Sequence, residues 1–327
     1  MSGAGPMRRA DDLFCEPAPV RADGLLDVGD GHRLYWRESG AADGVPMISC
    51  HGGPGGALMS GVSRFTDGRR VRLIQFDQRG CGRSEPRNEL RANTLQHTIA
   101  DMEHLRLYLG IDRWIVSGGS WGSTVALAYA QAHPEKCLGA FLVSLWLCRR
   151  SDTQWWFQGV RSLFPELWDE FAAFVPEAER IDLRSAYCRR ILGDDAVLAA
   201  DAATRLYLYE EGFMHFDAPL APANQARGPD YGRIFAHYAL NDFFLDDDAL
   251  LRDADRLENL PVSIITGRYD CCTTPANAWD LKQRLPHARL EIVPAAGHYP
   301  TEPAFARAVA RAAQVFVSDI EKQEGRA

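Results

Sequence analysis

The sequence predicts an α/β protein with a mainly parallel, doubly wound β-sheet and a helical cap inserted between its two halves. Short runs rich in Val, Ile and Leu recur along the chain, and helical patterns lie between them. Strands that alternate with helices favour parallel pairing, with the helices packed on both faces of the sheet. The middle of the chain is aromatic and charged and has no clear strand pattern, which predicts the helical insertion.

Six apolar runs have the length and composition of buried strands. They cover residues 46–50, 71–76, 114–116, 138–147, 262–266 and 290–293. Residues 1–30 are polar and contain Gly and Pro, and we interpret them as a lead-in or an early edge strand.

Three helices are indicated by their spacing and their ends. Thr94 is a residue type that caps helices, and apolar side chains follow it at three- and four-residue steps until Gly110. A second helix is expected over residues 123–133, before Pro134. A third is expected over residues 302–320, with apolar side chains on one side.

These elements divide the chain into three parts. Residues 1–147 are expected to form the first part of the α/β core, residues 148–245 the helical cap, and residues 246–327 the second part of the core. Within the cap, Pro, Ala and Gly cluster near residues 219–229 and predict loops there.

Composition excludes several classes of protein. The chain has 327 residues, 46% of them apolar, and a net charge of −8. A disordered chain would have fewer apolar residues, and a nucleic-acid-binding protein would need a basic surface. No apolar run is long enough to span a membrane and no signal peptide is evident, so we expect a cytoplasmic protein without a membrane partner. The eight cysteines are scattered and are expected to be free thiols.

The strongest local motif is Gly118-Gly119-Ser120-Trp121-Gly122, which fits the pattern G-x-S-x-G. In this pattern a serine sits on a sharp turn between a strand and a helix, and the glycines remove side chains that would clash there. The apolar run 114–116 precedes the motif and an Ala-rich helix follows it. We therefore predict that Ser120 is a nucleophile.

A serine hydroxyl needs a base, and the base needs an acid that orients it. In this type of fold the chain order is serine, then Asp or Glu, then His. Asp270 follows the predicted strand 262–266, and His298 follows the predicted strand 290–293. The order and the strand-end positions predict that Ser120, Asp270 and His298 form a catalytic triad.

The tetrahedral intermediate of such a reaction needs backbone N–H donors around its oxyanion. Trp121 directly follows the nucleophile, and the segment His51-Gly52-Gly53-Pro54-Gly55-Gly56 follows an early strand. We predict that Trp121 and Gly53 supply the two donors. His51 is interpreted as a structural residue, because no second ligand stands at metal-binding spacing near it.

No feature of the sequence calls for a cofactor or a metal. The glycine-rich segment fits neither the P-loop pattern nor the dinucleotide-binding pattern.

Residues 77–84, Asp-Gln-Arg-Gly-Cys-Gly-Arg-Ser, follow a strand and could form a substrate clamp. We favour the interpretation that they form a hydrogen-bonded loop near the active site.

Five stretches together resemble the proline iminopeptidase family of α/β-hydrolases: HGGPGG, DQRGCGRS, GGSWGS, GRYD and GHYP. Weaker similarity continues through the insertion and covers most of residues 30–320. The resemblance implies release of an N-terminal proline from small peptides or aminoacyl amides, without a metal, by a triad under a helical cap. It places the triad at Ser120, Asp270 and His298 and the oxyanion donors at Gly53 and Trp121.

The family also holds the free amine of its substrate with acidic residues of the cap. The resemblance assigns one of these acids to Glu210, and a shift of one residue would assign it to Glu211. Tyr209 stands where the family usually has a tryptophan, and Phe235 stands where it has a second acid. Glu210 is either the amine anchor or a solvated acid, and Phe235 is either cap core or part of a pocket for a bulkier acyl group.

The resulting expectation is a serine hydrolase that releases N-terminal proline or a similar aminoacyl group, with Glu210, Phe235 and Tyr209 as substrate-binding residues. Because the second cap acid is absent, an esterase or amidase for a specialised small molecule is the first alternative. A catalytically silent binding protein is the second alternative. The sequence leaves the oligomeric state open.

Overall fold

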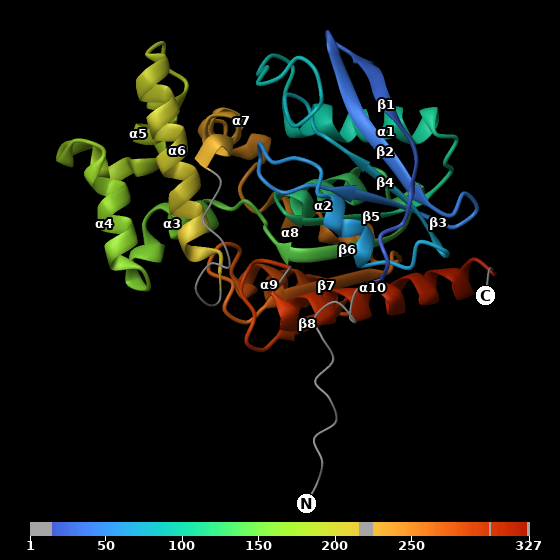
Figure 1. Ribbon diagram of the computed structural model, residues 1–327. Coiled ribbons are helices and arrows are strands. Elements are labelled where there is room, and N and C mark those ends of the chain that lie inside the picture. The colour runs from blue at the N-terminus through green and yellow to red at the C-terminus, as the bar shows by residue number, and fades with distance from the viewer. Residues whose placement is uncertain (1–14, 216–224, 301, 326–327) are drawn as a thin grey trace, which may run out of the picture.

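The computed structural model describes residues 15–215, 225–300 and 302–325. Within these ranges an eight-stranded sheet crosses the molecule in the order β1-β2-β4-β3-β5-β6-β7-β8 (Figure 1). Its strands are β1 (Val20–Gly29), β2 (His32–Gly40), β3 (Val45–Cys50), β4 (Val71–Phe76), β5 (Trp114–Ser120), β6 (Cys137–Leu145), β7 (Val262–Gly267) and β8 (Arg289–Val293). All six predicted strands are therefore present.

The sheet is parallel from β4 through β8, and its first two strands are antiparallel to their neighbours. β1 lies at the edge, which agrees with the edge-strand interpretation of the early residues. β2 was not predicted because charged side chains interrupt its apolar pattern. One of them, Glu38, is buried in an ion pair with Arg72, at 2.8 Å between Oε2 and Nη2.

The helices are α1 (Leu95–Tyr108), α2 (Trp121–Ala132), α3 (Arg150–Phe157), α4 (Pro165–Ala173), α5 (Leu183–Ile191), α6 (Ala196–Phe213), α7 (Gly228–Leu240), α8 (Ala249–Arg252), α9 (Pro275–Arg284) and α10 (Pro303–Gln323). The three predicted helices correspond to α1, α2 and α10. Thr94 caps α1 as predicted, because its side chain accepts a hydrogen bond from the main-chain N–H of His97.

Helices cover both faces of the sheet, as predicted. Alternation along the strands sends Ile48 and Val116 into the core with α1 and α2, and sends Met47 and Ile115 into the core with α10. The doubly wound arrangement follows from this alternation, because every central strand must bury both of its faces.

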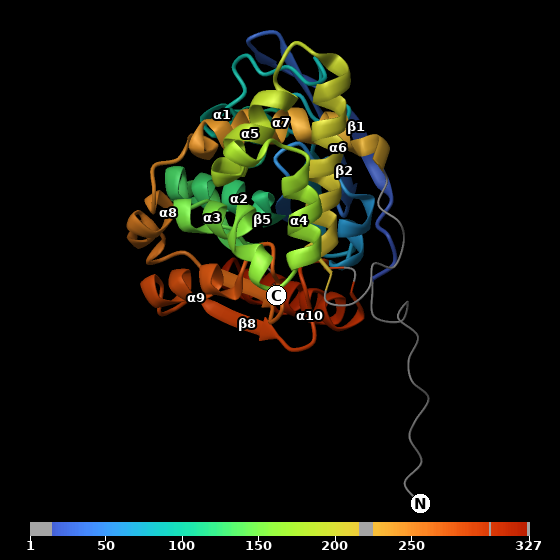
Figure 2. The same ribbon diagram turned by 90° about the vertical axis from the view of Figure 1, so that its left-hand side faces the viewer.

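Between β6 and β7 the described residues form helices and no strand. Figures 1 and 2 show α3 to α6 gathered at one end of the molecule, with α7 between them and the sheet. Aromatic side chains form the core of this helical region, where the Phe171 ring stacks on Tyr187 and on Tyr209 with ring centroids 4.0 Å apart in each pair. The aromatic composition of the insertion thus reflects its own packing, which is continuous with the hydrophobic core on the α1 and α2 face of the sheet.

The predicted limits of the cap at 147/148 and 245/246 fall between elements, and we retain residues 148–245 as its proposed extent. Most of the predicted loop at 219–229 lies outside the described residues, and its described part is helical, which corrects the prediction there: Gln225–Arg227 form a 3₁₀ turn and α7 begins at Gly228. The eight cysteines lie within the described ranges and are free thiols. No described helix has the length and apolar character needed to cross a membrane.

Candidate active site

Ser120 lies at the junction between β5 and α2, as the sequence motif predicts. Its backbone has φ 56° and ψ −131°, a conformation that non-glycine residues rarely adopt. The turn also explains the two outer glycines. A Cβ on Gly118 would lie 2.1 Å from the carbonyl oxygen of Gly122, and a Cβ on Gly122 would lie 2.1 Å from that of Cys50.

Asp270 and His298 meet at the same end of the sheet. The Nδ1 atom of His298 lies 2.9 Å from Oδ2 of Asp270, and both side chains are buried. The main-chain N–H groups of Cys272 and Thr273 donate to Oδ1 of Asp270, and the Thr273 hydroxyl donates to Oδ2. The carboxylate is therefore fixed in place and holds the His298 imidazole with Nδ1 as the protonated nitrogen.

The charge of Asp270 also changes the acidity of His298. Burial alone lowers the pKa of the His298 imidazole, but the nearby Asp270 carboxylate favours the imidazolium and raises the pKa above its ordinary value. His298 is thus poised to accept a proton and to stabilise the resulting charge.

The glycine-rich loop after β3 passes beside Ser120. A methyl group added to Gly52 would lie 3.5 Å from Cβ and 4.0 Å from Oγ of Ser120. Trp121 is the first residue of α2, and the leading N–H groups of a helix have no partner within that helix. The predicted donors Gly53 and Trp121 thus belong to segments that flank Ser120.

His51 has the structural role that the sequence predicts. The main-chain N–H of Gln78 donates to its Nε2 atom at 3.0 Å, so its Nδ1–H donates to the carbonyl oxygen of Gly52 at 2.8 Å. Burial lowers the pKa of His51 and keeps it neutral. Gln78 also accepts a hydrogen bond from the Trp121 indole. This network joins the three glycine-containing motifs beneath the predicted oxyanion site.

The predicted loop interpretation of residues 77–84 is confirmed. Arg79 is buried and makes two hydrogen bonds to Asp101, at 2.7 and 2.8 Å. Asp77 accepts hydrogen bonds from the main-chain N–H groups of Leu58 and Arg83. Both charges are used to hold the loops around the site.

A cavity of about 720 Å³ opens at Ser120 and His298. Its size is within the range of small-molecule sites in proteins. Gly53 lines the cavity, and so do Glu210 and Glu211 from α6. The structure therefore brings the predicted nucleophile, base, one oxyanion residue and both alternative cap acids around one space.

Glu210 is buried, which differs from the solvated-acid interpretation. The Tyr231 hydroxyl donates a hydrogen bond to its Oε2 atom, and the Cys272 thiol lies 3.9 Å from Oε1. Burial is the main reason that the pKa of Glu210 is raised to about 7. A cation that entered the cavity would favour the ionised form.

Sequence reasoning missed the role of Tyr231. Tyr231 lines the cavity one helical turn before Phe235, and Tyr299 lines it while donating a hydrogen bond to Glu211 at 2.7 Å. The four-residue spacing to Phe235 on a cap helix was the signal that could have identified Tyr231.

Phe235 and Tyr209 do not line the cavity, contrary to the expectation that they bind substrate. Phe235 is buried against Trp156 and Tyr231, with ring centroids 5.5 and 5.8 Å away. The Tyr209 hydroxyl donates to the carbonyl oxygen of Trp156. Both rings face the aromatic core of the cap because α6 and α7 pack against other cap helices on those sides.

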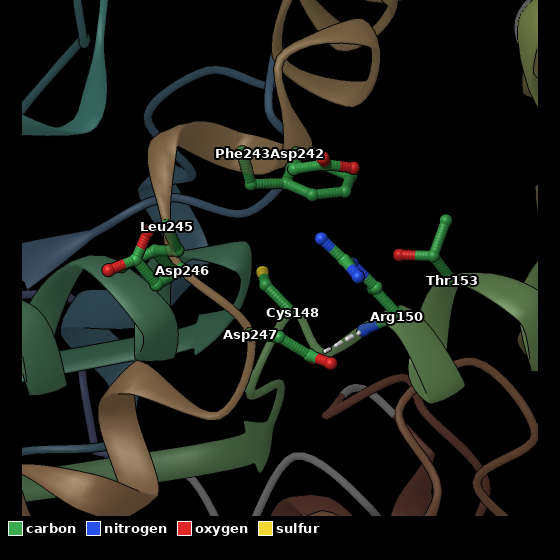
Figure 3. A pocket seen from close by; sticks show the side chains of 8 residues that line it. All are labelled: Cys148, Arg150, Thr153, Asp242, Phe243, Leu245, Asp246 and Asp247. Atoms are coloured by element: carbon green, nitrogen blue, oxygen red, sulfur yellow. Dashed lines mark hydrogen bonds between the residues drawn. The ribbon is translucent and has the colours of Figure 1, made fainter.

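A second, smaller hollow of about 140 Å³ lies where α3 meets the segment after α7. Figure 3 shows the Arg150 side chain reaching into it, and the Asp247 carboxylate accepts a hydrogen bond from the Arg150 main chain at 3.0 Å. None of its lining residues lines the cavity at Ser120. In the described ranges, no group of three or more His, Cys, Asp or Glu residues is arranged to hold a metal ion.

Comparisons with known proteins agree on the fold. The profile of the α/β hydrolase fold family matches residues 45–303. The chain is 43% identical over 311 residues to a proline iminopeptidase of Xylella fastidiosa, covering 93% of this chain and 99% of that protein. It is 39% identical to a proline iminopeptidase of Arabidopsis thaliana, covering 88% of this chain and 78% of that protein.

Solved structures give the same fold. The proline iminopeptidase of Mycobacterium smegmatis matches with a TM-score of 0.61 at 21% identity, over 93% of this chain and 100% of that chain. A proline iminopeptidase-related protein of Thermus thermophilus matches with a TM-score of 0.58 at 23% identity, over 91% and 98%. From the profile and the full-length relatives, we conclude that this chain belongs to the α/β-hydrolases and, within them, to the proline iminopeptidase family.

Proposed function

We propose that this protein is a serine peptidase that releases N-terminal proline, or a similar small aminoacyl group, from short peptides and amides. The observation that carries the proposal is the shared cavity, in which Ser120 and His298 face two cap acids, Glu210 and Glu211. The relatives named proline iminopeptidase support the same substrate class.

The reaction proceeds through an acyl-enzyme. The Ser120 hydroxyl attacks the carbonyl carbon while Nε2 of His298 takes its proton, and Asp270 stabilises the imidazolium. The main-chain N–H groups of Gly53 and Trp121 hold the oxyanion, and each donor is worth about 3–4 kcal/mol. His298 then protonates the leaving nitrogen as the C–N bond breaks. Water next attacks the acyl-enzyme while His298 takes a proton from it, and His298 returns this proton to Ser120 as the ester bond breaks.

The cap acids select substrates with a free amine. A protonated amine that binds beside Glu210 gains a charge-assisted hydrogen bond in a buried setting. The same cation favours the ionised form of Glu210, whose pKa is otherwise about 7. A substrate whose amine is blocked leaves the buried carboxyl group without this partner.

A panel of substrates tests this proposal directly. We expect prolyl amides to be cleaved faster than alanyl amides, and both faster than their N-acetylated forms. Short acyl esters, which lack the amine, serve as the contrasting set. Preference for blocked or amine-free substrates would instead favour the esterase or amidase.

Replacement of Glu210 by Gln is expected to raise KM for prolyl amides by about 10- to 100-fold, because one charge-assisted hydrogen bond is worth about 1.5–3 kcal/mol. The wild-type KM should fall as pH rises through about 7, where Glu210 ionises, and the variant should lose this pH dependence. Steady-state kinetics between pH 5.5 and about 8.5 measure both effects. Glu170→Gln, at an exposed position of α4 away from the cavity, is the matched control and should keep the wild-type KM. An unchanged KM in Glu210→Gln would refute the assignment.

The acid limb of kcat/KM is expected to reflect His298. Because the Asp270 carboxylate raises the pKa of His298, activity should fall as pH drops through a value above about 6.5, where the imidazole becomes protonated. An amine-free ester substrate isolates this effect from the ionisation of Glu210. If the midpoint of the acid limb with that substrate lay well below about pH 6, another group would serve as the base.

A further inference from the structure

The cavity at Ser120 extends beyond the cap to the face of the sheet that packs against α10. We call this extension the sheet lobe and define it by six apolar lining residues, Met47, Val62, Phe65, Leu73, Phe141 and Val143. Strand pairing places the four strand residues on one face, since Met47 pairs with Leu73, and the pairs Ser117–Phe141 and Gly119–Val143 continue across β5 and β6.

The sheet lobe is only partly filled by the side chains that the structure describes. Met47, Leu73 and Phe141 are buried in the core with α10, whereas the other three lining residues pack against that core and are half-buried. Val143 lies in an interior strand, paired with β5 on one side and β7 on the other, yet it is only half-buried. Its accessible surface faces the cavity that it lines. Val62 and Phe65, in and after the short 3₁₀ helix Ser60–Arg64, cover the lobe and are also half-buried.

Polar side chains beside the sheet lobe are held by the main chain. The Ser117 hydroxyl donates to the carbonyl oxygen of Ile48 at 2.8 Å, and the Gln75 amide donates to that of Met59 at 2.9 Å. These bonds direct these two polar groups toward the backbone. The six apolar side chains then supply hydrocarbon walls beside three further polar lining residues, Ser49, Arg64 and Thr66. Such walls recognise an aliphatic or aromatic group through the removal of its surface from water.

The position of Ser120 between the two parts of the cavity decides which end of the substrate enters the sheet lobe. The amine-bearing side of the reacting carbonyl extends toward Glu210 in the cap, so the leaving side extends away from it. His298 must protonate the leaving nitrogen, so this nitrogen lies beside the His298 side chain. The Ser144 hydroxyl donates a hydrogen bond to the main-chain carbonyl oxygen of His298 at 3.3 Å, and Ser144 is the neighbour of Val143 in β6. This proximity favours the sheet lobe as the region that receives the leaving side.

We propose that the sheet lobe binds an apolar side chain on the leaving group, so that the enzyme favours substrates in which the second residue is Leu, Phe or a similar residue. This inference rests on the proposed function for the direction of the substrate. It adds a specificity pocket, built from the sheet and the 3₁₀ helix, for the residue that follows the released one.

The test compares prolyl-leucinamide with prolyl-glycinamide. We expect kcat/KM to be at least about tenfold higher for the leucine compound, because it places several more carbons in an apolar pocket. Val143→Phe fills the sheet lobe from the strand, and Val62→Phe fills it from the 3₁₀ helix if the first variant fails to fold. Either variant should bring the ratio of kcat/KM for the leucine compound to kcat/KM for the glycine compound close to one, while the glycine compound keeps its wild-type rate.

Val315→Phe, on the exposed side of α10, is the matched control and should keep the wild-type ratio. A ratio near one in the wild type, or a ratio preserved in both lobe variants, would overturn the inference. The inference would also be overturned if the lobe variants hydrolysed p-nitrophenyl hexanoate more slowly relative to p-nitrophenyl acetate while the dipeptide ratio stayed intact. The lobe would then hold the acyl side of the substrate.

Binding to the Ser120→Ala variant separates this inference from the proposed function. Calorimetry should give a Kd for prolyl-leucinamide at least about tenfold below that for prolyl-glycinamide, and adding Val143→Phe or Val62→Phe should remove the difference. If this difference is found but the wild type releases no proline, the proposed function fails and the apolar pocket stands. Equal Kd values would overturn the pocket, whatever the turnover.

Discussion

Replacement of Ser120 by Ala is expected to lower kcat for prolyl amides by about 10⁵- to 10⁶-fold, the range seen when a triad nucleophile is removed. The loss follows from the loss of the acyl-enzyme, because no other hydroxyl occupies the turn between β5 and α2 where Ser120 stands beside Gly52. Substrate binding should persist, since the cap acids and the sheet lobe are untouched. Single-turnover kinetics at high enzyme concentration measure the residual rate.

Ser151→Ala is the control for this prediction, because Ser151 is exposed on α3 and away from the cavity. It should keep wild-type activity. A Ser120→Ala variant that retains more than about a hundredth of the wild-type kcat would contradict the role assigned to Ser120.

Replacement of Asp270 by Asn is expected to lower kcat by about 10⁴-fold. An amide nitrogen facing Nδ1 of His298 favours the tautomer with the proton on Nε2, so His298 can no longer accept the proton of Ser120. The variant should fold, because an amide oxygen can still accept from the main chain of Cys272 and Thr273. Steady-state kinetics and thermal melting measure the two effects separately.

Thr273→Val makes a smaller chemical change at the same site. It removes only the hydroxyl that donates to Oδ2 of Asp270, so a loss of up to about tenfold is expected. If Asp270→Asn lost no more activity than Thr273→Val, Asp270 would have only a structural role.

Much of the fold could be predicted because the decisive signals are local. The central strands bury both faces and appear in the sequence as short runs rich in Val, Ile and Leu, such as residues 71–76. The turn at Ser120 is likewise specified by its own residues, since close backbone approach requires the glycines at 118 and 122. The order of the three candidate catalytic residues then places Asp270 and His298 at the same sheet edge.

Features that depend on contacts between distant segments could not be predicted. The burial of Glu210 depends on how Tyr231 and Cys272 pack around it, and the orientation of Phe235 depends on which side of α7 meets the cap core. β2 was missed because its charge at Glu38 is neutralised by Arg72, a residue of another strand. The sheet lobe arises from strand register, which no single stretch of sequence determines.

The proposed mechanism depends on Ser120 as the nucleophile, activated by His298 and Asp270. The most direct measurement is peptide mapping by mass spectrometry after treatment of the full-length protein with a fluorophosphonate. We expect one stoichiometric adduct, located on Ser120, whose formation slows sharply in Asp270→Asn. An adduct on a different residue, or an unmodified Ser120 in protein that cleaves prolyl amides, would contradict it.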